Sequence, residues 1–442
     1  MKRYSLAIAI FLIAIFACSK SGNGGDGRNP PVDPPPPKEV IYDETGCLYT
    51  SYNNLVMAGY QGWFAAQGDD SQRGWYHYQN GSCGGFMPGC ASIDFWPDMT
   101  EYTKTYPSPF QFTNGSNAPL YSPYDEETVD LHFKWMKDYG IDGVFMQRFL
   151  MEVKNNEKGK RHFNKVLANA LKAANKYDRA ICVMYDLSGA SSTDIPYLEQ
   201  DWNELVSQFS LFDNKVNPTY LRHNKKPLVV IWGVGFNDNR KYATADINTL
   251  VEKLKGPTKK VSLMLGLPYY WRTFGNDTEN NPALHELIKK ADIILPWAVG
   301  RYSNDNYANV AGATLAGDIQ WCDANNITYT PLAFPGFSWG NLKNDPSQYN
   351  SIPRMKGDFL WKQVAGAKLS GAKSLYVAMF DEVDEGTAIF KCVNQSNLPL
   401  NGSKQFVGIE SDLDTDYYLW LTGQAGRWFR GESGFSINKP VR

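Results

Sequence analysis

The feature of this sequence that most constrains its fold is a series of short apolar runs that alternate with segments of helical periodicity. Runs of this length and composition predict strands buried on both faces. Eight of them occur, at residues 55–60, 143–147, 180–185, 228–232, 262–267, 293–297, 327–332 and 374–380. Eight successive strand–helix units predict a (β/α)8 TIM barrel.

The segments between the runs carry their apolar residues on one helical face. In the first of them Val129, Phe133 and Met136 form such a stripe, and Gly140 follows as a stop signal. Further stripes or weaker helical patterns lie at 163–174, 198–209, 247–254, 283–290, 309–323, 359–369 and 415–429. A doubly wound open sheet is the alternative fold. No Gly-x-Gly-x-x-Gly turn follows the first run to support it, and eight units favour closure.

A long loop insertion separates the first run from the second by about 80 residues. It is polar, rich in glycine and aromatic, and contains Trp75, His77 and Trp96. Long structured loops at the carboxyl face of a barrel commonly build the substrate cleft. We therefore expect these side chains near a binding site, with a structural lid as the alternative.

The chain begins with the pattern of a bacterial lipoprotein signal. Two basic residues precede an apolar segment at 6–16 that is too short to span a bilayer, and the residues up to Cys18 resemble a lipobox. We interpret residues 1–18 as the signal peptide and Cys18 as the lipid attachment site. An ordinary cleaved secretion signal is the alternative.

Residues 19–40 are rich in glycine and proline, which is typical of a disordered tether, and residues 41–442 are the predicted domain. This organisation predicts a protein anchored by its lipid in the bacterial cell envelope, on the periplasmic or the cell-surface face of the outer membrane. We expect the lipid to be its only contact with the membrane, and the protein to be a monomer.

Charge and cysteine content exclude several functions. The 44 basic and 46 acidic residues leave no basic field to hold nucleic acid. Five histidines and the absence of a Cys-x-x-Cys pair predict no metal site, and no cofactor motif is present. Cys83 and Cys90 lie in a glycine-rich loop, where an oxidising compartment would permit a disulfide.

Residues at the ends of the strands converge on one mouth of a closed barrel. Aromatic rings there can stack on sugars, and amide, guanidinium and carboxyl groups can hold hydroxyls. Any one of the tryptophans could instead belong to the hydrophobic core, and Asp186 could instead cap a helix. With the insertion included, the predicted substrate-binding residues are Tyr60, Gln61, Trp63, Trp75, His77, Trp96, Gln147, Arg148, Asp186, Trp232, Trp297, Trp339, Asp381 and Asp384.

The eighth run leads directly into four carboxylates, Asp381, Glu382, Asp384 and Glu385. Neighbouring carboxylates raise one another's pKa values, which suits a site that needs a proton donor beside an ionised carboxylate. Glycoside hydrolysis normally uses two such groups, and Glu382 and Glu385 are close enough in sequence to face one sugar. A solvated acidic turn is the alternative interpretation.

The hexapeptide Asp-Glu-Val-Asp-Glu-Gly at 381–386 resembles the Asn-Glu-Trp-His-Glu-Gly signature of glycoside hydrolase family 99, the endo-acting α-mannosidases. Both glutamates and the glycine agree, and three positions differ. In general plan residues 50–430 are similar to the family 71/99-like bacterial proteins. The resemblance implies a retaining mechanism in which Glu382 deprotonates the 2-hydroxyl of the sugar and Glu385 acts as acid and then base. Family 71 α-1,3-glucanases invert, so the stereochemical outcome stays open.

The sequence therefore predicts a glycoside hydrolase that cleaves α-linked glycans or polysaccharides with Glu382 and Glu385. A surface lipoprotein that binds glycans without cleaving them is the alternative. A lyase would need a cationic cluster, for which Arg148, Arg272 and Arg301 are candidates that nothing in the sequence brings together. No Gly-x-Ser-x-Gly elbow supports serine hydrolysis.

Overall fold

A computed structural model describes residues 37–442. The predicted signal peptide, Cys18 and most of the predicted tether lie outside the described residues. Glu39–Arg442 form one compact unit. Within the described part of the chain, no helix is both long and apolar enough to cross a bilayer.

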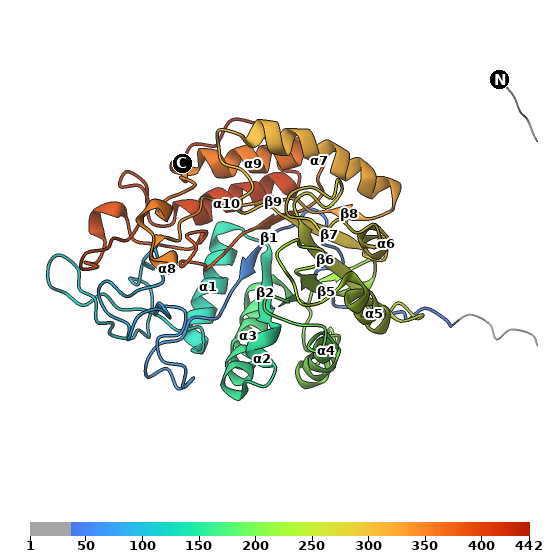
Figure 1. The fold of residues 1–442 in the computed structure, drawn as a ribbon, viewed down its shortest axis with the longest axis horizontal. Helices are drawn as coiled ribbons and strands as arrows, with labels where there is room; N and C mark the ends of the chain where they lie inside the picture. The colour runs from blue at the N-terminus through green and yellow to red at the C-terminus, as the bar shows by residue number, and fades with distance from the viewer. Residues whose placement is uncertain (1–36) are drawn as a thin grey trace, which may run out of the picture. The chain divides into compact units, whose positions relative to one another are not determined.

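Nine parallel strands form the central sheet in the order β8-β7-β6-β5-β3-β2-β1-β10-β9, and β4 adds antiparallel to β5 (Figure 1). The strands are β1 (Val56–Tyr60), β2 (Gly143–Phe149), β3 (Ala180–Asp186), β4 (Arg222–His223), β5 (Lys226–Trp232), β6 (Ser262–Pro268), β7 (Ile293–Trp297), β8 (Thr328–Tyr329), β9 (Leu332–Ala333) and β10 (Leu375–Val377). Each of the eight apolar runs overlaps at least one of them.

The sheet closes through a strand that is interrupted at Pro331. β8 pairs with β7 and β9 pairs with β10, so the two ends of the sheet are consecutive segments of one stretch of chain. The Thr330 N–H donates to the Ile294 carbonyl at 2.9 Å, and the Tyr376 N–H donates to the Pro331 carbonyl at 3.0 Å. The predicted (β/α)8 barrel is thereby confirmed, with β8 and β9 together as its seventh strand.

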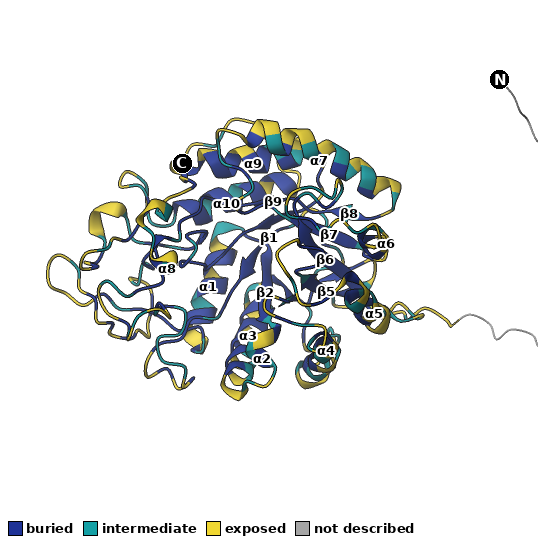
Figure 2. Ribbon diagram, viewed as in Figure 1, coloured by how far each residue is buried: buried dark blue, intermediate teal, exposed yellow. Residues whose placement is uncertain are grey.

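Helices surround the strands, which are almost entirely buried (Figures 1 and 2). The longer ones are α1 (Glu126–Tyr139), α3 (Glu157–Tyr177), α4 (Ile195–Phe209), α5 (Thr244–Lys255), α6 (Ala283–Ile288), α7 (Tyr307–Ala324), α9 (Asp358–Leu369) and α10 (Tyr417–Phe429). The short ones are α2 (Leu150–Val153), α8 (Gly340–Lys343) and the 3-10 turns η1 (Pro346–Gln348), η2 (Met355–Gly357) and η3 (Gln395–Asn397).

The first helix illustrates how the sequence directs these elements. Glu126 and Glu127 lie in the first turn of α1, where negative charge is favourable, and Gly140 ends the helix at φ +82°. The last helix, α10, packs very closely against the end of α1. A Cβ atom on Gly423 would lie 1.7 Å from the Tyr139 carbonyl oxygen, so only glycine fits this contact.

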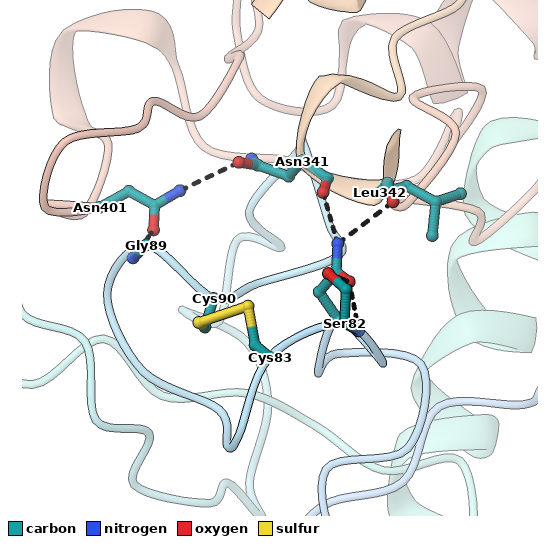
Figure 3. Close-up of a disulfide and its surroundings, with 8 residues drawn as sticks. Ser82, Cys83, Gly89, Cys90, Asn341, Leu342 and Asn401 are labelled. Carbon is teal, nitrogen blue, oxygen red and sulfur yellow. Dashed lines mark hydrogen bonds between the residues drawn. A yellow bond between two sulfur atoms is a disulfide. The ribbon is translucent and has the colours of Figure 1, made fainter. Parts of the chain in front are cut away.

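The insertion between β1 and α1 has little regular structure but a dense aromatic core that includes Phe64, Tyr78 and Tyr121. Cys83 and Cys90 form a disulfide in it, with Cα atoms 5.7 Å apart (Figure 3). The insertion also contacts the loop after β10, because the Asp94 and Phe95 N–H groups donate to the Val383 carbonyl at 3.0 and 3.2 Å. The longest loop of the barrel thus lies beside the carboxylate cluster.

Candidate active site

A cavity of about 450 Å³ opens at the carboxyl ends of the strands. This is the end of a (β/α)8 barrel where catalytic groups are normally found. Its walls come from residues at or just after the carboxyl ends of β1, β2, β3, β5, β7 and β10. The lining residues are Gln61, Trp63, His77, Gln147, Phe149, Met151, Glu152, Met184, Asp186, Ser188, Trp232, Trp297, Met379, Glu382 and Glu385.

Glu382 is held by donors to both of its carboxylate oxygens. The Gln61 amide donates to Oε1 and the Thr387 hydroxyl donates to Oε2. Burial, followed by the nearby charges of Glu385 and Asp384, raises its pKa well above that of an ordinary glutamate. Glu382 is therefore fixed in orientation and, when ionised, is a stronger base than an exposed carboxylate.

Glu385 lies in the same cavity with its carboxylate free. No donor among residues 37–442 reaches either of its side-chain oxygens, whereas its main-chain carbonyl accepts from the Ser338 N–H at 3.0 Å. Burial and the charge of Asp384 raise the pKa of Glu385 to about 7, although Lys343 acts in the opposite direction. At neutral pH this group can hold a proton and present it to a ligand in the cavity.

Asp381 performs a structural task beneath the cavity. Its carboxylate accepts the main-chain N–H groups of Gln61 and Gly62 at 2.7 and 2.9 Å and is fully buried. These bonds attach the start of the insertion to the loop after β10, and so place the Gln61 amide against Glu382. The predicted role of Asp381 in direct substrate binding is wrong, because the main chain occupies both of its oxygens.

Asp384 is directed toward the insertion and contacts His77. Its Oδ2 lies 3.4 Å from His77 Nδ1, while its buried Oδ1 has no partner among the described residues. Burial raises the pKa of Asp384 to about 7 and lowers that of His77 to about 3, so the imidazole is neutral. Asp384 supports the cavity wall through His77 and its charge raises the pKa of Glu385.

Aromatic rings form the remaining walls. His77 stacks on Trp63 with ring centroids 3.8 Å apart, and Phe149 stacks on the same indole at 4.9 Å. Trp232 and Trp297 meet edge to face at 5.3 Å. The indole N–H groups of Trp63 and Trp232 are buried and have no acceptor within the described part of the chain.

Gln147 of β2 and Asp186 of β3 direct polar side chains into the cavity. Asp186 accepts the Ser188 N–H at 2.7 Å, and burial raises its pKa. Gln147 donates to the Tyr376 hydroxyl at 3.0 Å. The strand ends thus deliver an amide and a carboxyl group to the same space as the two glutamates.

Two residues predicted to bind substrate point out of the barrel instead. Arg148 forms a buried ion pair with Asp201 of α4, at 2.6 Å from Nη2 to Oδ1, and Tyr60 bonds to His132 of α1 at 2.8 Å. Successive side chains of a strand face opposite sides. Because Gln147 and Gln61 face the cavity, their neighbours Arg148 and Tyr60 cannot.

Three predicted tryptophans also lie outside the cavity. Trp96 is fully buried against Phe110 of the insertion and Phe406 of the segment after β10. Trp339 donates its indole N–H to the Gln348 side chain at 2.8 Å. Trp75 lines a second hollow that adjoins the cavity.

Several lining residues were not predicted from the sequence: Phe149, Met151, Glu152, Met184, Ser188 and Met379. Strand alternation was a usable signal for two of them, because Phe149 follows Gln147 by two positions and Met184 precedes Asp186 by two. Glu152 belongs to α2, and no local sequence pattern identifies it as a lining residue. Within residues 37–442, no three or more His, Cys, Asp or Glu side chains are grouped so that they could hold a metal ion.

No protein family model matches the chain, and no curated protein matches it by sequence. Among solved structures it is similar to the GH99 endo-alpha-mannosidase from Bacteroides thetaiotaomicron, with 16% identity and a TM-score of 0.60 over 86% of this chain and 98% of that one. The same enzyme in complex with bis-tris-propane agrees equally well. A glycoside hydrolase-like protein is also similar, with 14% identity and a TM-score of 0.49 over 89% of this chain and 97% of that one. At this identity the likeness establishes the shared barrel fold.

Proposed function

We propose that this chain is a glycoside hydrolase that cleaves α-linked glycans or polysaccharides with Glu382 and Glu385. The observation that carries the proposal is the pairing of these glutamates in one cavity, one held on both oxygens and the other free. Two carboxyl groups in unlike environments are what an acid and its partner require. The similar endo-alpha-mannosidase and the 381–386 motif support the same reaction class and the α-linkage.

The two glutamates have different roles in this proposal. Glu385 protonates the leaving oxygen, because its raised pKa keeps the proton near neutral pH and its carboxyl group is free to reach the ligand. Glu382 acts on the sugar from a fixed position, which suits deprotonation of a hydroxyl. The donors Gln61 and Thr387 stabilise its ionised form.

The other walls of the cavity suit a sugar. The indoles of Trp63, Trp232 and Trp297 line the cavity, and such rings can stack on the apolar face of a pyranose. Asp186 and Gln147 add an acceptor and an amide at the ends of adjacent strands.

Product release from a glycan panel tests the proposal. The domain from Lys38 onward is incubated with α-mannans, α-glucans and mixed plant and host glycans, beside its Glu382→Gln and Glu385→Gln variants. We expect one substrate class to be cleaved by the wild type and by neither variant. Binding without cleavage across the panel would contradict hydrolysis and favour a glycan-capture protein.

We also propose that the protein is a lipid-anchored member of the bacterial cell envelope, on the strength of the lipobox-like residues before Cys18. Expression in bacteria with labelled palmitate should label the wild type. Cys18→Ser should abolish the label and release the protein from the membrane fraction, and equal labelling of the two would contradict the anchor.

A further inference from the structure

A second hollow of about 370 Å³ adjoins the catalytic cavity, and the two share one residue. His77 lines both, so its ring is the partition between them. The insertion supplies most of the second hollow, and Leu342 of α8 supplies the opposite wall. We call this space the insertion hollow; its main lining residues are Arg73, Trp75, Tyr76, His77, Gln79 and Leu342.

The partition is held from several sides. His77 adopts φ +60°, an unfavourable backbone conformation for a residue with a side chain, and its carbonyl accepts a bond from the Ser92 hydroxyl. Its ring stacks on Trp63 and its Nδ1 faces Asp384. The imidazole is therefore held between the two spaces. Its side chain is 26% exposed.

The walls of the hollow are joined across a long distance in sequence. The Asn80 amide donates to the carbonyls of Asn341 and Leu342 at 2.7 and 3.1 Å, and the Cys83–Cys90 disulfide closes the loop that follows (Figure 3). Asn401 accepts the Gly89 N–H at 2.8 Å on the other side of that loop. These bonds hold the insertion against α8, so the hollow is preformed.

Charged and polar groups connect the hollow with the catalytic cavity. Arg73 and the Tyr76 hydroxyl both donate to Glu152, which lines the cavity. The Arg73 side chain is only 4% exposed, and its Nη1 has no partner among residues 37–442. Because Glu152 balances Arg73 and His77 is neutral, the hollow suits an uncharged, hydroxyl-rich ligand with a ring that can lie on Trp75.

From this arrangement we propose that the insertion hollow binds a further sugar unit of the glycan whose neighbouring units occupy the catalytic cavity. The glycan crosses the edge of His77, and one ring packs on Trp75 beside Arg73. This inference rests on the proposed function, because it assumes a glycan in the catalytic cavity. It makes Trp75 a determinant of the chain length that the protein recognises.

The experiment measures affinity against chain length. α-Manno- and α-gluco-oligosaccharides of increasing length are titrated by calorimetry into Glu385→Gln, alone and combined with Trp75→Ala, Trp75→Phe or Trp420→Ala. Trp420 is the matched control, because it is a half-buried tryptophan of α10 that lines neither space. Thermal unfolding of each variant verifies that it is folded.

We expect the affinity of Glu385→Gln to rise about tenfold when the oligosaccharide becomes long enough to cross His77. Trp75→Ala should remove that step, Trp75→Phe should keep most of it, and Trp420→Ala should leave it unchanged. The step is a ratio of affinities within one variant, so a partly inactive preparation does not alter it.

The outcomes for the hollow and for hydrolysis are separable. If Trp75→Ala retains the tenfold step in affinity, or if affinity does not change with oligosaccharide length, the proposed sugar site in the hollow is refuted, even where the wild type cleaves glycans. A step that Trp75→Ala removes supports the hollow even where no glycan is cleaved, and in that case hydrolysis alone is contradicted. Failure of every oligosaccharide in the series to bind overturns the hollow.

Discussion

The loop after β10 and the insertion after β1 border the same cavity and are built in opposite ways. The loop places four carboxyl groups within five residues, and each has its own environment: main-chain donors for Asp381, side-chain donors for Glu382, His77 for Asp384 and open space for Glu385. The insertion contributes mainly aromatic surface, spread over more than sixty residues.

The difference indicates where sensitivity to change should lie. In the loop, the function of each carboxyl group depends on single oxygen atoms. Isosteric substitutions there should therefore have large effects on the reaction rate. In the insertion, shape is distributed over many contacts, so single changes should alter stability or affinity with smaller effects on the reaction itself. The predictions below test this contrast.

The largest effect is expected at Glu385, and it should depend on the leaving group. Glu385→Gln should lower kcat/KM for a natural glycan about 1000-fold, because the leaving sugar needs a proton. The loss should be much smaller for a 2,4-dinitrophenyl glycoside, whose leaving group departs as an anion. Steady-state kinetics with both substrates, for Glu385→Gln and Glu382→Gln, check this prediction.

In that experiment Glu382→Gln should impair both substrates to a similar extent. The opposite pattern, with the activated substrate rescued only in Glu382→Gln, would exchange the two roles.

The next effect concerns stability against pH at Asp381. Burial raises its pKa to about 7, whereas an unfolded aspartate has a pKa of about 4, so the folded state binds the extra proton in this range. Its contribution to stability is therefore present below pH 4 and is lost as the pH rises to 7. Asp381→Asn should remove from the pH dependence a change on the order of 4 kcal/mol.

Denaturant unfolding at several pH values between 4 and 7 measures this slope. Asp246→Asn is the matched control, since hydrogen bonds from Ser192 and the Ala243 N–H lower the pKa of Asp246 and its titration lies below this range. Parallel curves for the wild type and Asp381→Asn would refute the prediction, whatever their vertical separation.

In the insertion, the disulfide should matter for stability more than for chemistry. Replacing both Cys83 and Cys90 by serine should lower the free energy of unfolding by about 2 kcal/mol, because the bridge restricts a short loop in the unfolded chain. Denaturant unfolding with and without reductant provides the measurement. Cys47→Ser, at a free cysteine, should be close to neutral, and an equally large loss there would remove the contrast.

The smallest effect is expected from one hydroxyl in the loop. Thr387→Val removes a donor to Glu382, and since that bond lowers the pKa of Glu382, its loss should raise the pKa further. The acid limb of kcat/KM should move to higher pH, and kcat/KM should fall about tenfold.

Thr422→Val is the control for that measurement. It is equally buried, but its hydroxyl donates to the Tyr418 carbonyl within α10. An unchanged pH profile in Thr387→Val would show that Glu382 does not titrate in the rate-limiting step.

The order of strands and helices was predictable because it depends on local periodicity. Buried strands must be apolar on both faces and helices on one, so the eight runs and the stripes between them could be identified without tertiary information. The carboxylate cluster was predictable for a similar reason, since Glu382 and Glu385 directly follow a strand and barrel strands deliver their ends to one mouth.

Only the tertiary structure decided which side chains face the cavity and what surrounds them. Arg148 and Tyr60 are adjacent in sequence to lining residues, yet they point outward because alternation sends neighbours to opposite faces. Closure through β8 and β9, and the contacts of Asp384 with His77 and Glu382 with Gln61, join residues far apart in the chain. Such contacts arise from packing of the whole barrel, which no local pattern encodes.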